Sequence, residues 1–192
     1  MSHIHRQRGF ALLLAFAALV SGCSTANRGG ATPQGSSPPR TGLPLPLSQT
    51  LEAGQHGWTL LDGNRETLGE QTGRVLVLDF YATWCGPCRE SVPQLVELQR
   101  RYGPQGLRIV GLNVGGPEDR FQIADFVREF GIQYDLGYPD EGMSDLFFAD
   151  DTRIPQTFVF DRHGRLVRRF IGYDPSTAQE LERAIREALA AT

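Results

Sequence analysis

The feature that most constrains the fold is a nearly continuous apolar run, Val75–Tyr81, which is interrupted only by Asp79. Strands that are buried on both faces have this pattern, because neither face of the strand meets water. Segments with strand and helix patterns alternate along the rest of the chain. The sequence therefore predicts an α/β fold, in which a mixed sheet carries helices on both faces.

The other expected elements follow from hydrophobic periodicity and from turn residues. Strands are expected at residues 58–61, 107–114, 156–160 and 166–171, the last two forming a hairpin around the turn 161–164. Helices are expected from residue 85 to about 102, from about 118 to 130, at 142–149, and from the N-cap Asp174 onward. The second of these helices places five apolar residues on one face: Phe121, Ile123, Ala124, Val127 and Phe130. Together these elements predict one domain, residues 55–192.

The N-terminal segment has the pattern of an export signal. Basic residues precede an apolar stretch at residues 10–20, which is too short for a membrane span of about 20 residues but fits a secretory signal. The sequence Val20-Ser21-Gly22-Cys23 that follows resembles a bacterial lipobox, in which the signal is cut before the cysteine and its thiol receives diacylglycerol. We expect a signal peptide at 1–22, a lipidated Cys23 that attaches the chain to a membrane, and a flexible Pro/Gly/Ser tether up to residue 54. A signal peptide with a chance cysteine and a frayed apolar N-terminus are the alternatives.

Composition excludes several classes of function. The formal charge of −3 comes without any basic run, so nucleic acid is not expected as a partner. The chain has three cysteines, and lipidation of Cys23 leaves one Cys-x-x-Cys pair in an oxidising compartment. A structural zinc site needs four ligands, but there is no second cysteine pair, and His56 and His163 stand isolated. We therefore expect no metal, and no cofactor other than a redox-active disulfide.

The remaining pair, Cys85 and Cys88, stands at the start of a predicted helix. Backbone N–H groups and the helix dipole stabilise an anion there, Pro87 fits the first helical turn, and Arg89 adds a nearby positive charge. On this basis Cys85 attacks a substrate disulfide and Cys88 resolves the mixed disulfide. A structural role is the alternative, although a disulfide that closes so small a loop contributes little stability.

Asp79 is the second candidate for chemistry. A carboxylate inside an apolar strand is costly to bury and its pKa should rise, which suits a proton acceptor for Cys88. The alternative is an acid at a strand end that reaches solvent.

The segment from Leu78 to Cys88 resembles the active site of the thioredoxin family, and an extra strand-helix segment before Ile154-Pro155 is similar to the TlpA/ResA-like branch of exported, membrane-tethered thioredoxins. The resemblance covers roughly residues 55–191. It implies that Pro155 is a cis-proline facing the disulfide and that the Ile154 backbone pairs with an extended substrate segment. Proline as a mere strand-initiating residue is the alternative. The resemblance further implies that three neighbours of the cysteines contact the substrate: Trp84, Gly86 and Pro87.

Two departures from the branch qualify the resemblance. Asn113-Val114-Gly115 is followed by Gly116 where the branch typically has a Glu, with Glu118 two positions further on, so the acid-base role is assigned to Asp79. The chain also lacks the Gly-Ala-Pro-Glu-like sequence of dedicated cytochrome c maturation thioredoxins, which puts a role confined to apocytochrome in doubt.

We expect an extracytoplasmic thiol:disulfide oxidoreductase that reduces protein disulfides with electrons from a membrane or periplasmic donor. The Gly86-Pro87 dipeptide favours reduction, because thioredoxin, which has it, is reducing. An oxidant or isomerase that uses the same site, and a thioredoxin-fold binding module with a vestigial pair, are the alternatives. Because Ser24 rather than Asp follows Cys23, the outer membrane is favoured over the inner.

Overall fold

The computed structural model describes residues 55–191. The predicted signal peptide at 1–22, the lipidated Cys23 and the tether up to residue 54 lie outside the described residues. Within residues 55–191, no helix is both long and apolar enough to cross a membrane.

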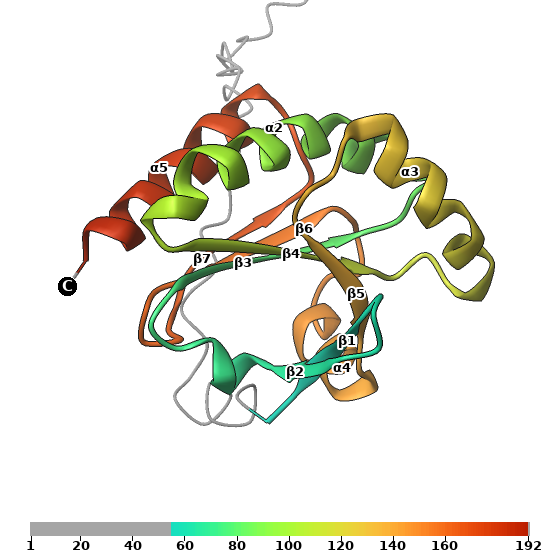
Figure 1. Cartoon of the computed structure of the whole chain (residues 1–192), viewed down its shortest axis with the longest axis horizontal. Helices are drawn as coiled ribbons and strands as arrows, with labels where there is room; N and C mark the ends of the chain where they lie inside the picture. Colours follow the sequence, from blue (N-terminus) through green and yellow to red (C-terminus); the bar gives the residue numbers. More distant parts are fainter. Residues whose placement is uncertain (1–54, 192) are drawn as a thin grey trace, which may run out of the picture. The chain divides into compact units, whose positions relative to one another are not determined.

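A seven-stranded mixed sheet forms the centre of the fold, in the order β2-β1-β5-β4-β3-β6-β7. The strands are β1 (Gly57–Leu60), β2 (Arg65–Thr67), β3 (Val75–Tyr81), β4 (Leu107–Asn113), β5 (Asp135–Pro139), β6 (Gln156–Phe160) and β7 (Leu166–Ile171). The pairs β3–β4 and β4–β5 are parallel, and the outer pairs on both sides are antiparallel. Figure 1 shows β3 and β4 in the middle of the sheet, with the hairpin β6–β7 at one end.

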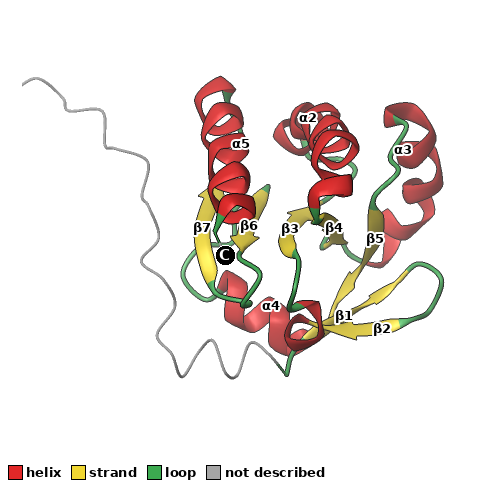
Figure 2. Ribbon diagram, turned by 60° about the vertical axis from the view of Figure 1, so that its left-hand side comes forward, coloured by secondary structure: helices red, strands yellow, loops and turns green. Residues whose placement is uncertain are grey.

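Helices cover the two faces of the sheet unequally. The helices are α2 (Gly86–Tyr102), α3 (Ile123–Phe130), α4 (Glu141–Phe148) and α5 (Pro175–Ala190), with shorter 3-10 helices η1 (Leu68–Gln71), η2 (Gly103–Gln105) and η3 (Pro117–Gln122). Buried side chains of α2, α3 and α5 share one apolar cluster, whereas those of α4 belong to the other. Figure 2 shows this arrangement, with α2, α3 and α5 on one side of the sheet and α4 on the opposite side.

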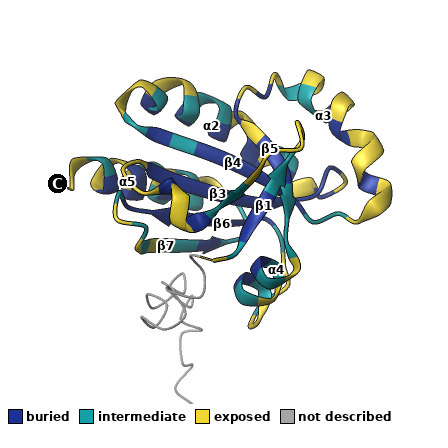
Figure 3. Ribbon diagram, turned by 60° about the horizontal axis from the view of Figure 1, so that its bottom comes forward, coloured by how far each residue is buried: buried dark blue, intermediate teal, exposed yellow. Residues whose placement is uncertain are grey.

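Strand β3 connects the two clusters because its side chains alternate between the faces. Val75, Val77 and Tyr81 belong to the cluster beneath α2, while Leu76, Leu78 and Phe80 belong to the cluster beneath α4. All seven residues of β3 are buried, and Figure 3 shows the central strands as the most buried part of the molecule. By the same alternation, Asp79 faces α2.

The predicted fold class is confirmed: the sheet is mixed, helices lie on both faces, and β4, α3, β5 and α4 stand between α2 and Pro155. The long helix expected at 118–130 is wrong in its first half, because Pro117–Gln122 forms η3 and α3 begins at Ile123. Phe121 is 77% exposed and Ala124 is also exposed, so the expected apolar face is formed instead by Ile123 and Phe126, with Val127 and Phe130 half-buried.

Candidate active site: a cysteine pair at the N-terminus of α2

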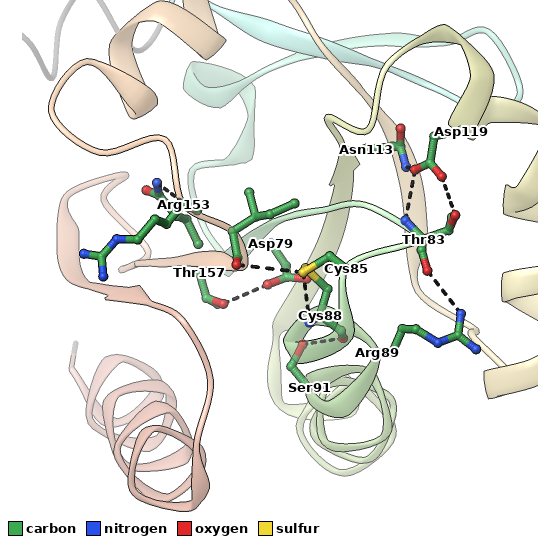
Figure 4. Close-up of a disulfide and its surroundings, with 12 residues drawn as sticks. Asp79, Thr83, Cys85, Cys88, Arg89, Ser91, Asn113, Asp119, Arg153 and Thr157 are labelled. Carbon is green, nitrogen blue, oxygen red and sulfur yellow. Dashed lines mark hydrogen bonds between the residues drawn. A yellow bond between two sulfur atoms is a disulfide. The ribbon is translucent and has the colours of Figure 1, made fainter.

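The two cysteines follow directly from the end of β3. The strand ends at Tyr81, a short loop carries Thr83 and Trp84, and Cys85 is the N-cap of α2. Cys85 and Cys88 form a disulfide with their Cα atoms 5.2 Å apart (Figure 4). The strand, buried on both faces, therefore presents the pair at the carboxyl edge of the sheet.

The Cys85 sulfur is the one that a substrate can reach. The Cys88 backbone N–H points at Cys85 Sγ, 3.2 Å away, which is the arrangement that stabilises a thiolate at a helix N-terminus. Cys88 has no exposed surface, whereas Cys85 retains 6%. The residues predicted to contact substrate surround Cys85 and are themselves exposed: Trp84, Gly86 and Pro87.

The side chain of Arg89 lies between α2 and α3. Its guanidinium pairs with Glu129 of α3, donates to the Thr83 carbonyl at 3.1 Å and lies 5.1 Å from the Phe130 ring centroid. Figure 4 shows the side chain extending toward Thr83 rather than along the disulfide. The partners of the Arg89 guanidinium are therefore Glu129 and the Thr83 carbonyl, and not the cysteine pair.

Asp79 lies beneath the cysteine pair, on the α2 face of β3. It is 1% exposed, and one carboxylate oxygen accepts a hydrogen bond from Thr157 Oγ1 at 2.8 Å. The other oxygen, Oδ2, has no hydrogen-bond partner among the described residues. Burial raises the pKa of Asp79 to about 6, partly opposed by the Thr157 bond. This carboxyl can therefore take up or release a proton near neutral pH.

The loop before β6 lies across from the cysteines. The Ile154–Pro155 peptide bond is cis, as the resemblance implies, and the Ile154 carbonyl oxygen lies 3.8 Å from Cys85 Sγ. The buried Gln156 fixes this loop, because its amide donates to the carbonyls of Asp151 and Arg153 at 2.6 and 2.8 Å. Arg169 of β7 in turn donates to the Gln156 side-chain oxygen.

Asp119 is a site residue that the sequence reasoning missed. It is 3% exposed and accepts hydrogen bonds from Thr83, next to Trp84, and from Asn113 at the end of β4. Its neighbour Glu118, the acid two positions beyond the site of the Glu typical of the TlpA/ResA-like branch, is exposed. The turn Gly115-Gly116-Pro117 signals that the chain reverses at the carboxyl end of a central strand, but it precedes both Glu118 and Asp119 and does not tell which acid is buried.

The histidines lie away from the cysteine pair. His56 approaches Asp140 at 3.9 Å near the start of α4, and His163 lies in the β6–β7 turn. In the part of the chain from residue 55 to 191, no three His, Cys, Asp or Glu side chains are grouped as a metal site.

Known proteins with the same features identify the family. A sequence model described as Redoxin matches residues 49–185. Thiol-disulfide oxidoreductase ResA of Bacillus cereus is 32% identical over 127 residues, which cover 65% of this chain and 69% of the relative.

Two solved structures are also similar. One, from Chlorobium tepidum and described as a thiol:disulfide interchange protein DsbE, has a TM-score of 0.62 at 26% identity and covers 72% of this chain and 96% of that one. The other, from Bacteroides thetaiotaomicron and described as a protein disulfide isomerase, has a TM-score of 0.60 at 28% identity and covers 70% of this chain and 86% of that one.

The Redoxin match spans every strand of the sheet and includes the segment that carries the disulfide. The chain belongs to the Redoxin family, as a TlpA/ResA-like thiol:disulfide oxidoreductase of the thioredoxin superfamily.

Proposed function

We propose that this oxidoreductase works in the reducing direction, on protein disulfides outside the cytoplasm. The observation that carries the proposal is the place of Cys85 at the N-cap of α2, with the Cys88 N–H directed at its sulfur and Gly86-Pro87 between the cysteines. A stabilised Cys85 thiolate makes the dithiol reactive toward disulfides, and this dipeptide accompanies a low potential in thioredoxin.

In the proposed reaction the Cys85 thiolate attacks one sulfur of a substrate disulfide. A bond forms between Cys85 and that sulfur, and the other substrate sulfur leaves as a thiolate that takes a proton. Cys88 then gives its proton to Asp79 and attacks Cys85 Sγ, which forms the Cys85–Cys88 disulfide and releases the second substrate thiol. The substrate gains two electrons, and an upstream membrane or periplasmic dithiol donor restores the enzyme.

The backbone of the half-buried Ile154, beside Cys85, supports a polypeptide substrate. The Ile154 carbonyl, held opposite the sulfur by the cis-proline loop, is positioned to pair with the N–H of an extended segment. Trp84 is 67% exposed and offers apolar surface at the same place.

A redox potential measured by equilibration with glutathione tests the direction. Thioredoxin lies at about −270 mV and protein disulfide isomerase at about −180 mV. We expect a value nearer the first, together with reduction of insulin disulfides by the dithiol form. A potential at or above the second value contradicts the proposal and favours an oxidant or an isomerase, and the similar structure from Bacteroides thetaiotaomicron is described as a protein disulfide isomerase.

The location is part of the proposal. Residues 1–22 direct export, Cys23 carries the lipid, and residues 24–54 tether the domain on the periplasmic side of the outer membrane. The support comes from the lipobox-like sequence and from Ser24, which is not an inner-membrane retention residue. Membranes separated by density should hold the protein in the outer fraction, and Cys23→Ala should release it. Recovery in the inner membrane contradicts the sorting, and a Cys23→Ala protein that stays membrane-bound contradicts the anchor.

A further inference from the structure

The loop that carries Trp84 is fixed at Thr83. The Thr83 N–H donates to Asp119 Oδ2 at 2.9 Å, and its hydroxyl donates to Asp119 Oδ1. Its carbonyl oxygen accepts from Arg89 at 3.1 Å. Every polar group of Thr83 is therefore engaged, two residues before the attacking sulfur.

Asp119 joins this loop to the carboxyl end of β4. Besides its bonds to Thr83, it accepts a hydrogen bond from Asn113 Nδ2 at 2.6 Å, and Asn113 Oδ1 accepts from the Gly115 N–H at 3.2 Å. A Cβ on Gly115 would overlap the Asp119 carboxylate, so the close approach requires a glycine at this position. Figure 4 shows Asn113, Asp119, Thr83 and Arg89 as one connected series beside the disulfide.

The geometry at Cys85 depends on this loop. Cys85 is the N-cap of α2 with extended backbone angles, and its N–H donates to the Ala82 carbonyl at 3.2 Å. The Cys88 N–H reaches Cys85 Sγ only while the cap keeps these angles. A buried carboxylate is costly unless its hydrogen bonds are satisfied, and Asp119 accepts two of them from Thr83, two residues before the N-cap Cys85.

We propose that Asp119 is a positioning residue for thiol-disulfide exchange, which acts through Thr83 to hold Cys85 where the N-terminus of α2 stabilises its thiolate. The inference rests on the oxidoreductase activity and holds for either direction of electron flow.

A variant that tests the role of Thr83 should leave the charged and titratable groups around Cys85 unchanged. They are Cys88 and Arg89 of α2, Glu129 of α3, Asp79 of β3, Asp119 of η3, and the Asp151–Arg153 pair of the cis-proline loop. Thr83→Val removes the hydroxyl bond without altering any of these charges. Thr83→Ser keeps the hydroxyl and is the matched control.

The experiment measures the rate of Cys85 alkylation by iodoacetamide against pH in the reduced full chain, with the thermal midpoint as a check of folding. In Thr83→Val the pKa of the Cys85 thiol should rise, so the alkylation rate at pH 7 should fall by about three- to tenfold. This range corresponds to the free energy of one buried hydrogen bond. Thr83→Ser should stay within about twofold of the unmodified protein on the same scale. A Thr83→Val protein with an unchanged profile, or equal losses in both variants, overturns the proposal.

Asp119→Asn provides a second test that also applies if Thr83→Val does not fold. Removing a negative charge near Cys85 would by itself lower the thiol pKa and speed alkylation at pH 7. Positioning predicts the opposite, because an amide has one acceptor oxygen and cannot replace both carboxylate oxygens as acceptors of the three hydrogen bonds from Thr83 and Asn113. Slower alkylation in Asp119→Asn supports the positioning role, and unchanged or faster alkylation overturns it. The redox potential of the unmodified protein, measured separately, decides the direction of electron flow without reference to either variant.

Discussion

Asp79 is a buried titratable residue whose carboxyl lowers the stability of the fold at neutral pH. It is buried on β3 with one unpartnered oxygen, and its folded-state pKa is raised from 3.8 to about 6. Because the folded protein binds this proton more tightly than the unfolded chain, stability falls as pH rises from about 4 to about 6 and then levels off. At 1.36 kcal/mol per pH unit, the ionised carboxylate costs about 3 kcal/mol above pH 7.

Asp79→Asn should remove this pH dependence in the disulfide form. We expect the difference in free energy of unfolding, variant minus unmodified protein, to be about 2.5 kcal/mol larger at pH 8 than at pH 4, because the variant lacks the cost of ionising the buried carboxyl. Urea unfolding at several pH values measures the difference. Parallel curves for the two proteins across this range would show that Asp79 is not the titrating group, and Asp125→Asn, an exposed acid on α3, is the control.

The two cysteines should differ in a trapping experiment. Cys88→Ser leaves the reachable Cys85 to attack but removes the resolving thiol, so mixed disulfides with substrate should accumulate. Cys85→Ser leaves only the fully buried Cys88, which should trap little. Non-reducing gels compare the two variants. Equal trapping by both would show that the attacking and resolving roles are wrongly assigned.

Single residues were predictable where local sequence alone determines their environment. Cys85 and Cys88 stand at a helix start that short-range spacing reveals, and Asp79 lies in a strand whose burial its neighbours reveal. Asp119 and the direction of Arg89 depend on partners far along the chain, Thr83 and Glu129. No local pattern specifies such pairings.

At the scale of elements, dependence on partners far along the chain also explains the errors in the predicted strands and helices. Strand β3 was predicted with its observed bounds, because a nearly continuous apolar run of this length is typical of a strand buried on both faces. Strand β5, Asp-Leu-Gly-Tyr-Pro, was missed because it contains Gly and Pro and lacks alternation. It is a strand through pairing with β4 and β1, and a Cβ on Gly137 would lie 2.5 Å from the Thr59 carbonyl oxygen.

Two phenylalanines on either side of the η3–α3 boundary make the element-level correction testable. Phe126 is 2% exposed and stacks on Tyr81 with ring centroids 5.3 Å apart, whereas Phe121 is 77% exposed. Phe126→Ala should lower the free energy of unfolding by about 3–5 kcal/mol, the usual cost of removing a buried aromatic ring. Phe121→Ala should change it by less than about 0.5 kcal/mol. Urea unfolding of both variants checks this, and similar losses would favour the single buried helix at about 118–130 that the sequence predicts.

For the whole molecule, the described residues contain a complete sheet and both apolar clusters. The clusters are built from residues between Trp58 and Leu189, and β1, the first strand, pairs with β5 on one side and β2 on the other. Trp58 has no exposed surface and lies in the cluster beneath α4. Strand β1 is therefore part of the core structure, and the domain boundary should fall just before it.

A pair of truncations tests this boundary. A chain that starts at Gln55 should keep its thermal midpoint within about 2 °C of the full protein and reduce insulin at the same rate, because it retains every strand of the sheet. A chain that starts at Asp62 loses β1 and Trp58, which leaves the edge of β5 unpaired and opens a cavity beneath α4. Losing a buried aromatic side chain alone costs about 3–5 kcal/mol, so the midpoint should fall by about 10 °C or more. Circular dichroism melts of the two proteins make the comparison. If the chain from Asp62 has the same thermal midpoint as the chain from Gln55, β1 contributes nothing to the stability of the domain. If the chain from Gln55 is already less stable than the full protein, residues before Gln55 belong to the folded unit.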